Sequence, residues 1–268
     1  MSFEIDTEHM DRIQTLVSFF LLGLFLGGFF NVVVWRLFAL IGLKEKSRCQ
    51  SCRRYLPAFD QIPLVSYWLL GGRCRYCQKP ISLQYPVIEL LSALCFTLYA
   101  DKILFQTAFS GSFFAGLTLV LGLYLIAIFI ITIASDFRYS LIYDWVIIPA
   151  LPFTFAASVI LGTPIGSIAL ALLVAVVFFG GQAYFSEERW LGQGDVKFSL
   201  LLAIAFGFKP FLYIIAMAYL LGSVTSVFLI ITKKRKLSGA LPFGVFLGAA
   251  GLICLIFGVN WLDKLLGL

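Results

Sequence analysis

Long apolar blocks dominate this chain and restrict what it can fold into more than any single motif does. Hydrophobic residues make up 61% of its 268 residues and charged residues only 13%, a composition that argues against an ordinary soluble domain. A helix needs about 20 apolar residues to cross a bilayer, and the strictly alternating segments of an outer-membrane barrel are absent from the sequence. We therefore predict an all-α polytopic membrane protein.

The apolar blocks predict about eight transmembrane helices. The first block follows an acidic start rather than a basic one, so we expect it to be a retained span and not a signal peptide. The sixth is short and is expected to be tilted or half-buried. The predicted spans are Ile13–Leu40, Tyr85–Tyr99, Ser112–Ser135, Trp145–Leu161, Ile165–Ser186, Val196–Phe208, Phe211–Thr232 and Leu241–Val259.

The basic residues predict the orientation of these spans. Most of the 20 Lys and Arg residues fall on one face, which the positive-inside rule makes cytoplasmic, with both termini outside. A solvated or lipid-facing basic surface explains the formal net charge of +6 without nucleic acid. The basic residues of the cytoplasmic face are Arg36, Lys44, Lys46, Arg48, Arg53, Arg54, Arg73, Arg75, Lys79, Arg138, Arg189, Lys197, Lys233, Lys234, Arg235 and Lys236, and the other face keeps Arg12, Lys102, Lys209 and Lys264.

Two pairs of cysteines lie in the one sizeable segment outside the spans. We expect three parts: a first span with a short outer tail at residues 1–43, a cytoplasmic loop domain at 44–84, and a multi-span membrane domain at 85–268. The loop carries two Cys-x-x-Cys motifs, whose spacing is typical of a tetrahedral, zinc-ribbon-like site. Its ligands would be Cys49, Cys52, Cys74 and Cys77.

Two other uses of these cysteines are possible in principle, a pair of disulfides and a redox pair. Disulfides are disfavoured in a reducing cytosol, and a redox pair needs only one motif. A closed site with four sulfurs leaves no position for water, so the predicted zinc is structural. Cys95 and Cys254 fall in spans and are expected to pack there, while the single histidine, His9, lies in the outer tail, so histidine-based catalysis on the cytoplasmic face is unsupported.

An acidic residue at the start of a hydrophobic segment is the main catalytic signal. The stretch Gly192-Gln193-Gly194-Asp195 precedes the short sixth span, and helix capping by Asp195 is the simplest interpretation. Asp136 ends the third span, and two membrane crossings separate it from Asp195, so both carboxylates are expected at the cytoplasmic border.

Two close carboxylates cannot both ionise easily, so such a pair can share a proton. One then acts as a base on water and the other as an acid toward a carbonyl, which is the chemistry of aspartyl proteolysis. Two independent acids, one capping a helix and one paired with Arg138 or Lys197, remain the alternative. Rival acids by position are Asp144, Glu187 and Glu188.

Ordered motifs over almost the whole chain resemble those of the bacterial type IV prepilin peptidases, which are GxGD-type aspartic proteases with N-methyltransferase activity. The matching stretches are Leu26–Leu37, Asp60–Ser66, Gly72–Cys77, Ile81–Leu91, Asp136 with Asp144, Gly192–Lys197 and Leu241–Gly244. Three positions depart from the family: Gly28 replaces a usual serine, and Gln50 and Tyr143 replace prolines. The change at Tyr143 affects the turn expected at Asp144, and hence the role expected for Asp144.

The resemblance implies a specific set of roles. Asp136 and Asp195 would be the catalytic aspartates, supported by Asp144, Gly192, Gly194 and Lys197, and the four cysteines would bind zinc. The enzyme would sit in the bacterial inner membrane and remove the leader of type IV prepilins or pseudopilins of pilus, type II secretion or competence systems. It would cut after a glycine and then methylate the new N-terminal residue, usually Phe, from S-adenosylmethionine.

Methylation rests on the resemblance alone, because no independent mark of a methyl-donor site is found in the sequence. Asp60, Arg73 and Glu89 are weak candidates for binding the donor or the new amine, and roles in salt bridges and caps are equally open. The alternatives are a peptidase without methyltransferase activity and a non-enzymatic membrane assembly factor. A transporter is less attractive, because its acids would lie in mid-span. The sequence leaves the oligomeric state open.

Overall fold

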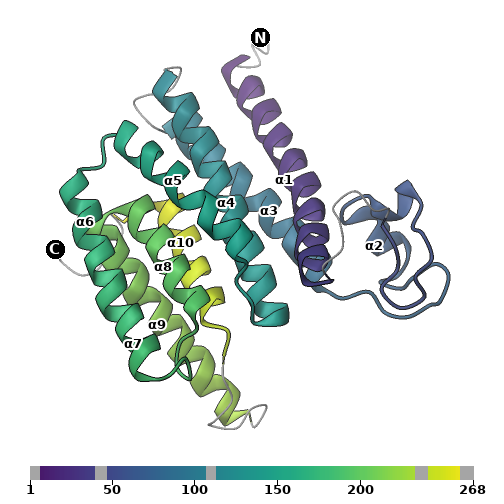
Figure 1. Cartoon of the computed structure of the whole chain (residues 1–268). Coiled ribbons are helices and arrows are strands. Elements are labelled where there is room, and N and C mark those ends of the chain that lie inside the picture. Colours follow the sequence, from purple (N-terminus) through teal and green to yellow (C-terminus); the bar gives the residue numbers. More distant parts are fainter. Residues whose placement is uncertain (1–6, 40–46, 107–112, 233–240, 260–268) are drawn as a thin grey trace. The chain divides into compact units, whose positions relative to one another are not determined.

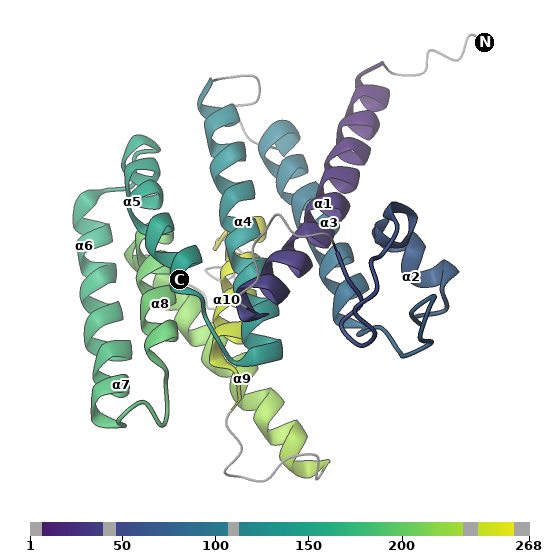
Figure 2. The same cartoon turned by 45° about the vertical axis from the view of Figure 1, so that its right-hand side comes forward.

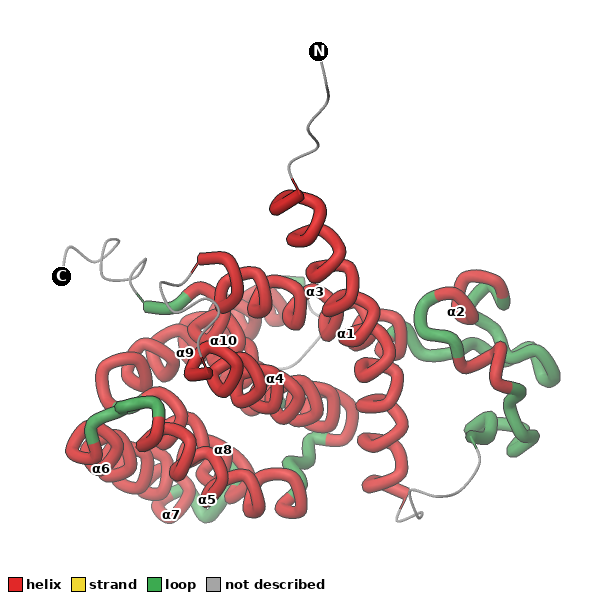
Figure 3. Tube along the Cα trace, turned by 90° about the horizontal axis from the view of Figure 1, so that it is seen from above, coloured by secondary structure: helices red, strands yellow, loops and turns green. Residues whose placement is uncertain are grey.

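The computed structural model describes residues 7–39, 47–106, 113–232 and 241–259. It divides into two compact units, residues 1–134 and 135–268. Across the described ranges the regular elements are helices, and the only strand-like pairings are two isolated β-bridges (Figure 3). The all-α prediction is confirmed. Both termini, Lys44, Lys46, Lys264 and the basic run at 233–236 lie outside the described residues, so the predictions made for them stay predictions.

A tightly packed helix pair organises the first unit. Helix α1 (Thr7–Ala39) lies beside α3 (Gln84–Asp101), which continues into a π-helical turn η2 (Lys102–Gln106) (Figure 1). Two glycines allow this contact: a Cβ at Gly23 would lie 2.6 Å from Ala93 Cα, and one at Gly27 would lie 2.7 Å from Glu89 Cα. Small residues let helix backbones approach closely, which is how membrane helices gain packing energy without a hydrophobic driving force.

The loop between α1 and α3 carries a short 3₁₀ turn η1 (Ala58–Gln61) and helix α2 (Val65–Leu69). Leu64, just before α2, has a positive φ of 59°. In this conformation its backbone N–H donates a 2.7 Å hydrogen bond to Glu89 on α3. The buried Glu89 carboxylate therefore fastens the loop to the helix pair.

Helix α4 (Phe113–Tyr139) runs from the first unit into the second. The second unit then contains α5 (Asp144–Ile160), α6 (Ile165–Val174), the π-helical turn η3 (Ala175–Gly180), α7 (Gly181–Phe185), α8 (Gln193–Phe206), α9 (Phe208–Ile231) and α10 (Phe243–Phe257). Helix α8 is central, because it contacts α5, α6, η3, α9 and α10 (Figure 2). Helix α8 packs on other helices around much of its circumference, because its buried residues fall on several faces: Phe198, Ser199, Leu201, Leu202, Ala203 and Ile204.

Each predicted span corresponds to a helix, but the helices differ in length. Four are long and apolar enough to cross a membrane: Met10–Ala39 within α1, α4, the continuous Ile165–Phe185 formed by α6, η3 and α7, and α9. Helices α5 and α10 are apolar but shorter. A multi-pass membrane protein is therefore supported, and the count of eight spans stays a prediction.

The boundary between the predicted sixth and seventh spans differs from the structure for a physical reason. Helix α8 ends at Phe206 because Gly207 adopts a φ of +69°, a conformation that glycine tolerates and that breaks the helix. The Ser167 hydroxyl then accepts a 2.9 Å hydrogen bond from the Phe208 N–H and caps α9. Phe208, which the sequence assigned to the end of a span, instead begins the next helix.

Candidate active site

The first of the two predicted aspartates is held by the start of another helix. Asp136 lies near the C-terminal end of α4 and is only 5% exposed. Its Oδ2 accepts a 3.0 Å hydrogen bond from the Val245 N–H, and the Gly244 amide faces the same carboxylate. These amides belong to the first turn of α10, where backbone N–H groups have no partner within the helix and carry partial positive charge.

The second aspartate combines a capping contact with an unpartnered oxygen. Helix α8 starts at Gln193, after an extended Gly192, so Asp195 is its third residue. Its Oδ2 accepts a 3.3 Å hydrogen bond from the Gly192 N–H, so Asp195 caps α8 from inside its first turn and not, as expected from the sequence, from the position before the helix. Its Oδ1 is buried and has no hydrogen-bond partner among the described residues. Leaving a buried acceptor unpaired costs about 1–3 kcal/mol, so capping alone does not account for this carboxylate.

Three segments that are distant in the sequence meet around Ile142, on the turn between α4 and α5. A Cβ at Gly194 would lie 2.9 Å from Ile142 Cβ, and a Cβ at Gly244 would lie 2.9 Å from Ile142 Cδ1 and 2.8 Å from Asp136 Oδ2. Only glycine permits these approaches without a shift of neighbouring atoms. The starts of α8 and α10 thus close on the end of α4, and the two carboxylates interact electrostatically.

The rival acids have exposed partners instead. Asp144 begins α5 and forms a 2.8 Å ion pair with Lys197 on α8, so Lys197 pairs with Asp144. Glu187 forms a 3.1 Å pair with Arg189, and Glu188 accepts a hydrogen bond from Gln193. These contacts distinguish the solvated acids from Asp136, which is buried, and from Asp195, whose Oδ1 is buried.

The unusual Tyr143 does not disturb the start of α5. Its φ of −83° and ψ of 121° are extended, close to the conformation that a proline would impose. Its carbonyl accepts hydrogen bonds from the N–H groups of Val146 (3.0 Å) and Ile147 (3.2 Å). Asp144 therefore occupies the first position of α5. A proline at position 143 would allow the same start of the helix.

The four loop cysteines form a compact cluster in the first unit. Their Sγ atoms all lie within 4.8 Å of one another, and those of Cys49 and Cys77 are 3.9 Å apart. A tetrahedral zinc with Zn–S bonds of about 2.3 Å places its sulfurs about 3.8 Å apart, so the cluster fits this metal. Backbone N–H groups of Cys77 and Tyr76 lower the pKa of the Cys74 thiol to about 7, whereas burial and the neighbouring thiols raise the pKa of Cys77 to about 11.

The two knuckles have the same local geometry. The residue after each second cysteine has a positive φ: 57° at Arg53 and 56° at Gln78. In this conformation Arg53 N–H donates to Cys49 O at 2.9 Å, and Gln78 N–H donates to Cys74 O at 3.0 Å. Each knuckle therefore closes on itself and directs two sulfurs to one side.

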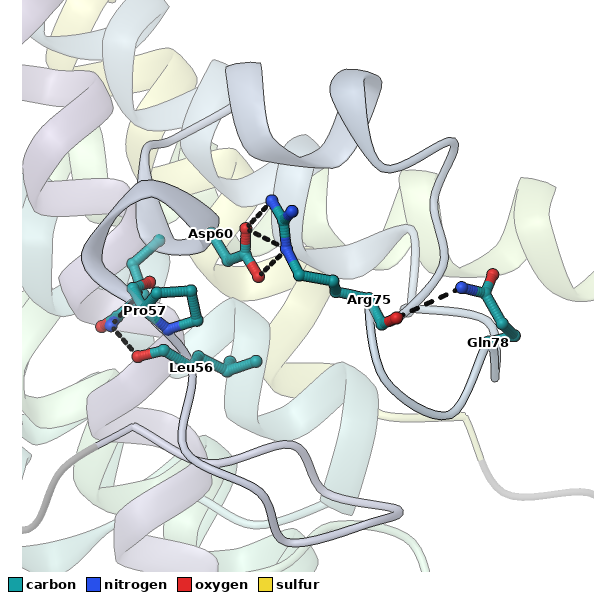
Figure 4. Close-up of polar contacts among 6 residues, drawn as sticks. Leu56, Pro57, Asp60, Arg75 and Gln78 are labelled. Carbon is teal, nitrogen blue, oxygen red and sulfur yellow. Dashed lines mark hydrogen bonds and ion pairs between the residues drawn. The ribbon is translucent and has the colours of Figure 1, made fainter.

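The three weak candidates for cofactor binding are not joined to one another. Asp60 forms a bidentate ion pair with Arg75, with a shortest distance of 2.7 Å, and its side chain is 2% exposed (Figure 4). Glu89 holds the Leu64 amide, as described above, and Arg73 is exposed. In the part of the chain that the structure describes, no hydrogen bond or ion pair connects Asp60, Arg73 and Glu89. Asp60 and Glu89 are instead held by structural contacts, with Arg75 and with the Leu64 amide respectively.

Sequence reasoning missed the residues that assemble the aspartate site. Ile142 is an ordinary apolar residue, and nothing in its local pattern marks it. Gly244 belongs to the Leu241–Gly244 motif, which does not reveal its role, and Val245 stands in an ordinary apolar block. Gly244 and Val245 matter because their amides face Asp136, more than a hundred positions away. Ile142 matters because it packs against Gly194 and Gly244.

Fold and site together define a class: a multi-pass helical membrane protein with one buried and one half-buried carboxylate, at the end of α4 and the start of α8. Comparison with known protein families supports this class. The model of the bacterial peptidase A24 N-terminal domain matches residues 21–103, and that of the type IV leader peptidase family matches residues 119–227. No solved structure matches the chain.

Curated relatives extend the match to most of the chain. A prepilin leader peptidase/N-methyltransferase from Neisseria gonorrhoeae is 30% identical over 89% of this chain and 88% of its own length. Proteins with the same name from Aeromonas hydrophila and Bacillus subtilis are 27% and 26% identical, also over 89% of this chain, and the matches cover 89% and 93% of their own lengths. The chain belongs to the type IV leader peptidase family.

Proposed function

We propose that this protein is an aspartic endopeptidase of the bacterial inner membrane. It removes the leader of type IV prepilins or pseudopilins and then N-methylates the new N-terminal residue from S-adenosylmethionine. The relatives named above carry both activities in their names. The observation that carries the peptidase proposal is the pairing of the buried Asp136 with Asp195, whose buried Oδ1 has no hydrogen-bond partner among the described residues.

The surroundings of the two carboxylates suggest different roles in the reaction. Amides at the start of α10 stabilise negative charge on Asp136. The buried, unpartnered Oδ1 of Asp195 suits an oxygen that carries the shared proton. Asp136 then takes a proton from the attacking water, and Asp195 donates its proton to the carbonyl oxygen of the scissile bond. When the tetrahedral intermediate breaks down, Asp136 gives its proton to the leaving amine, and a hydroxyl of the intermediate returns a proton to Asp195 as the carbonyl re-forms.

Supporting residues position this pair. Gly194 and Gly244 allow Ile142 to pack between α8 and α10, and Gly192 provides the amide that holds Asp195. The ion pair of Lys197 with Asp144 links α8 to α5. In this arrangement the proteolytic chemistry belongs to residues 85–268.

The loop at 44–84 would carry a structural zinc, bound by Cys49, Cys52, Cys74 and Cys77. A small loop without its own hydrophobic core gains its stability from such a metal. The predicted orientation puts this loop and the aspartate pair on the cytoplasmic side, with both termini outside. The donor for methylation would be S-adenosylmethionine, and its binding residues are not assigned.

The test is intact-mass analysis of a purified prepilin incubated with the protein in detergent, with and without S-adenosylmethionine. We expect loss of the leader with the wild type and one added methyl group when the donor is present. Asp136→Asn and Asp195→Asn should each slow cleavage by about 100-fold or more. Asp101→Asn is a matched control, because Asp101 forms an ion pair with Arg12 in the first unit and should leave cleavage intact.

The outcomes separate the alternatives. Cleavage without methylation would identify a peptidase only. If the folded wild type cleaves no prepilin, or if either aspartate variant cleaves as well as the wild type, the protease proposal fails. A non-enzymatic assembly factor would then be the better account.

A further inference from the structure

An exposed apolar patch covers the short helix α2 and the turn η1 in the loop of the first unit. On α2, Val65, Trp68 and Leu69 follow the spacing i, i+3 and i+4, so they lie on one face of the helix. Trp68 is 77% exposed and Leu69 82%. Phe59 lies on η1, which contacts α2, and is 79% exposed. Large apolar side chains gathered on a surface in this way mark a site of contact with a partner or a membrane.

Two contacts place this segment beside the membrane-spanning part of the helix pair. Pro63, just before α2, lies 3.3 Å from the position that a Cβ on Gly28 of α1 would occupy. The next amide, of Leu64, donates its hydrogen bond to Glu89 on α3. The apolar stretch of α1 runs over Met10–Ala39, and a crossing takes about 20 residues, so every stretch of that length within it includes Gly28. The patch is therefore held alongside α1 at the depth of the bilayer and not beyond the end of the helix (Figures 1 and 2).

The backbone of this segment suits the edge of a bilayer, where amides need partners within the protein. The Trp68 N–H donates to Leu64 O at 3.1 Å, and the Leu70 N–H donates to Ser66 O at 3.0 Å. The only charged residue from position 57 to position 72 is Asp60. Its side chain is 2% exposed and is paired with an arginine of the second knuckle (Figure 4). The patch thus carries no charge of its own.

The two cysteine knuckles on either side of this segment are positively charged. Residues 47–83 include six basic residues and one acid, so the loop stays positive even when four thiolates around a divalent zinc add two negative charges. Anionic lipid headgroups attract such residues at a membrane surface. All six basic side chains are exposed: Arg48, Arg53, Arg54, Arg73, Arg75 and Lys79.

We propose that η1 and α2 form an interfacial anchor on the bilayer that α1 crosses. Phe59, Trp68 and Leu69 enter the boundary between headgroups and acyl chains, and the basic residues of the knuckles contact anionic headgroups. Tryptophan is enriched at this boundary, and apolar segments bind there through buried apolar area and attraction to anionic lipids. The anchor holds the cysteine loop against the membrane surface. This inference does not depend on the peptidase chemistry.

The experiment measures the fluorescence of Trp68 in the full chain, reconstituted in nanodiscs of phosphatidylcholine and phosphatidylglycerol. The Trp68 signal is the difference between the wild type and Trp68→Phe, which keeps an aromatic ring. We expect lipids brominated in the acyl chain to lower this signal at least about twofold, as for a ring at the acyl boundary, and aqueous acrylamide to leave it nearly unchanged. Quenching by acrylamide alone would place Trp68 in water. Quenching by neither would place it against protein, either the second unit or another copy of the chain, and both results overturn the anchor.

A double variant tests the neighbouring side chains. Phe59→Ser with Leu69→Ser keeps Trp68 but removes apolar area beside it, so the Trp68 signal should become sensitive to acrylamide. Val120→Ser is the matched control, because it changes an exposed apolar residue on α4, and it should keep the wild-type pattern. An unchanged pattern in the folded double variant overturns the anchor.

A measurement on the wild type covers the case in which Trp68→Phe does not fold. A phosphatidylcholine with a photoreactive diazirine on its acyl chain is activated in the nanodiscs, and the labelled peptides are mapped by mass spectrometry. We expect label within residues 58–70. Label on the membrane helices without label in this segment overturns the proposal.

Discussion

The cysteine cluster and the aspartate pair are two sites built in opposite ways. In the cluster, two knuckles of identical shape each close on their own backbone and direct two sulfurs toward a common point. In the pair, Asp136 and Asp195 come from different helices and depend on a third segment, the start of α10. One site is made by local geometry and the other by packing between distant segments. This difference determines how each site should respond to mutation.

Loss of the metal should have the largest effect. Cys52→Ser, or treatment with a chelator, should remove zinc and unfold the loop, because binding of a structural zinc contributes on the order of 10 kcal/mol to such folds. Zinc content by mass spectrometry and protease protection of residues 47–83 measure this. Cys95→Ser is the control, since Cys95 lies buried on α3, away from the cluster. A metal-free protein with a fully protected loop would show that the loop is held by its other contacts.

The four-cysteine site could be predicted from the sequence. The spacing within Cys49–Cys52 and Cys74–Cys77 already requires two tight turns, so four ligands could be named without a structure. The helices were also predictable, because apolar composition over long blocks specifies them. The ends of the helices were less predictable. Gly207 ends α8 through its positive φ, and the start of α9 is capped by Ser167, which lies on a different helix.

The aspartate site was only partly predictable. Counting membrane crossings placed Asp136 and Asp195 at one border, which requires no knowledge of packing. It could not reveal that one oxygen of Asp195 is buried and has no hydrogen-bond partner in the described ranges. Nor could it reveal Val245 as a donor to Asp136, because such a contact follows from how helices pack.

A second prediction tests whether the position of Asp136 depends on its packing against the start of α10. Gly244→Ala adds a Cβ 2.8 Å from Asp136 Oδ2 and 2.9 Å from Ile142 Cδ1, so the carboxylate must move. Misplacing a catalytic group by about 1 Å can cost about 100-fold in rate, and we expect a loss of that order in prepilin cleavage. Gly116→Ala, on α4 with nothing within 4 Å of the added Cβ, should cleave normally. Wild-type rates in Gly244→Ala would mean that α10 does not position Asp136.

The ion pair at the edge of the site should matter least. Lys197 and Asp144 are 34% and 51% exposed in their side chains, and exposed pairs contribute about 0–1 kcal/mol. Lys197→Met should therefore lower thermal stability only slightly and cleavage by no more than about fivefold. Arg189→Met, which breaks the fully solvated pair with Glu187, should have no measurable effect. A loss with Lys197→Met as large as with Gly244→Ala would mean that Lys197 takes part in the chemistry.

The most direct test of the central claim is a double-mutant comparison of the two aspartates. The measurement is kcat for prepilin cleavage by Asp136→Asn, Asp195→Asn and the double variant, with folding checked by thermal unfolding. If the carboxylates share one proton and act in one step, each single variant loses about 100- to 10,000-fold, and the double variant is no slower than the worse single variant. Losses that multiply in the double variant would show two independent acids and would contradict a shared-proton pair.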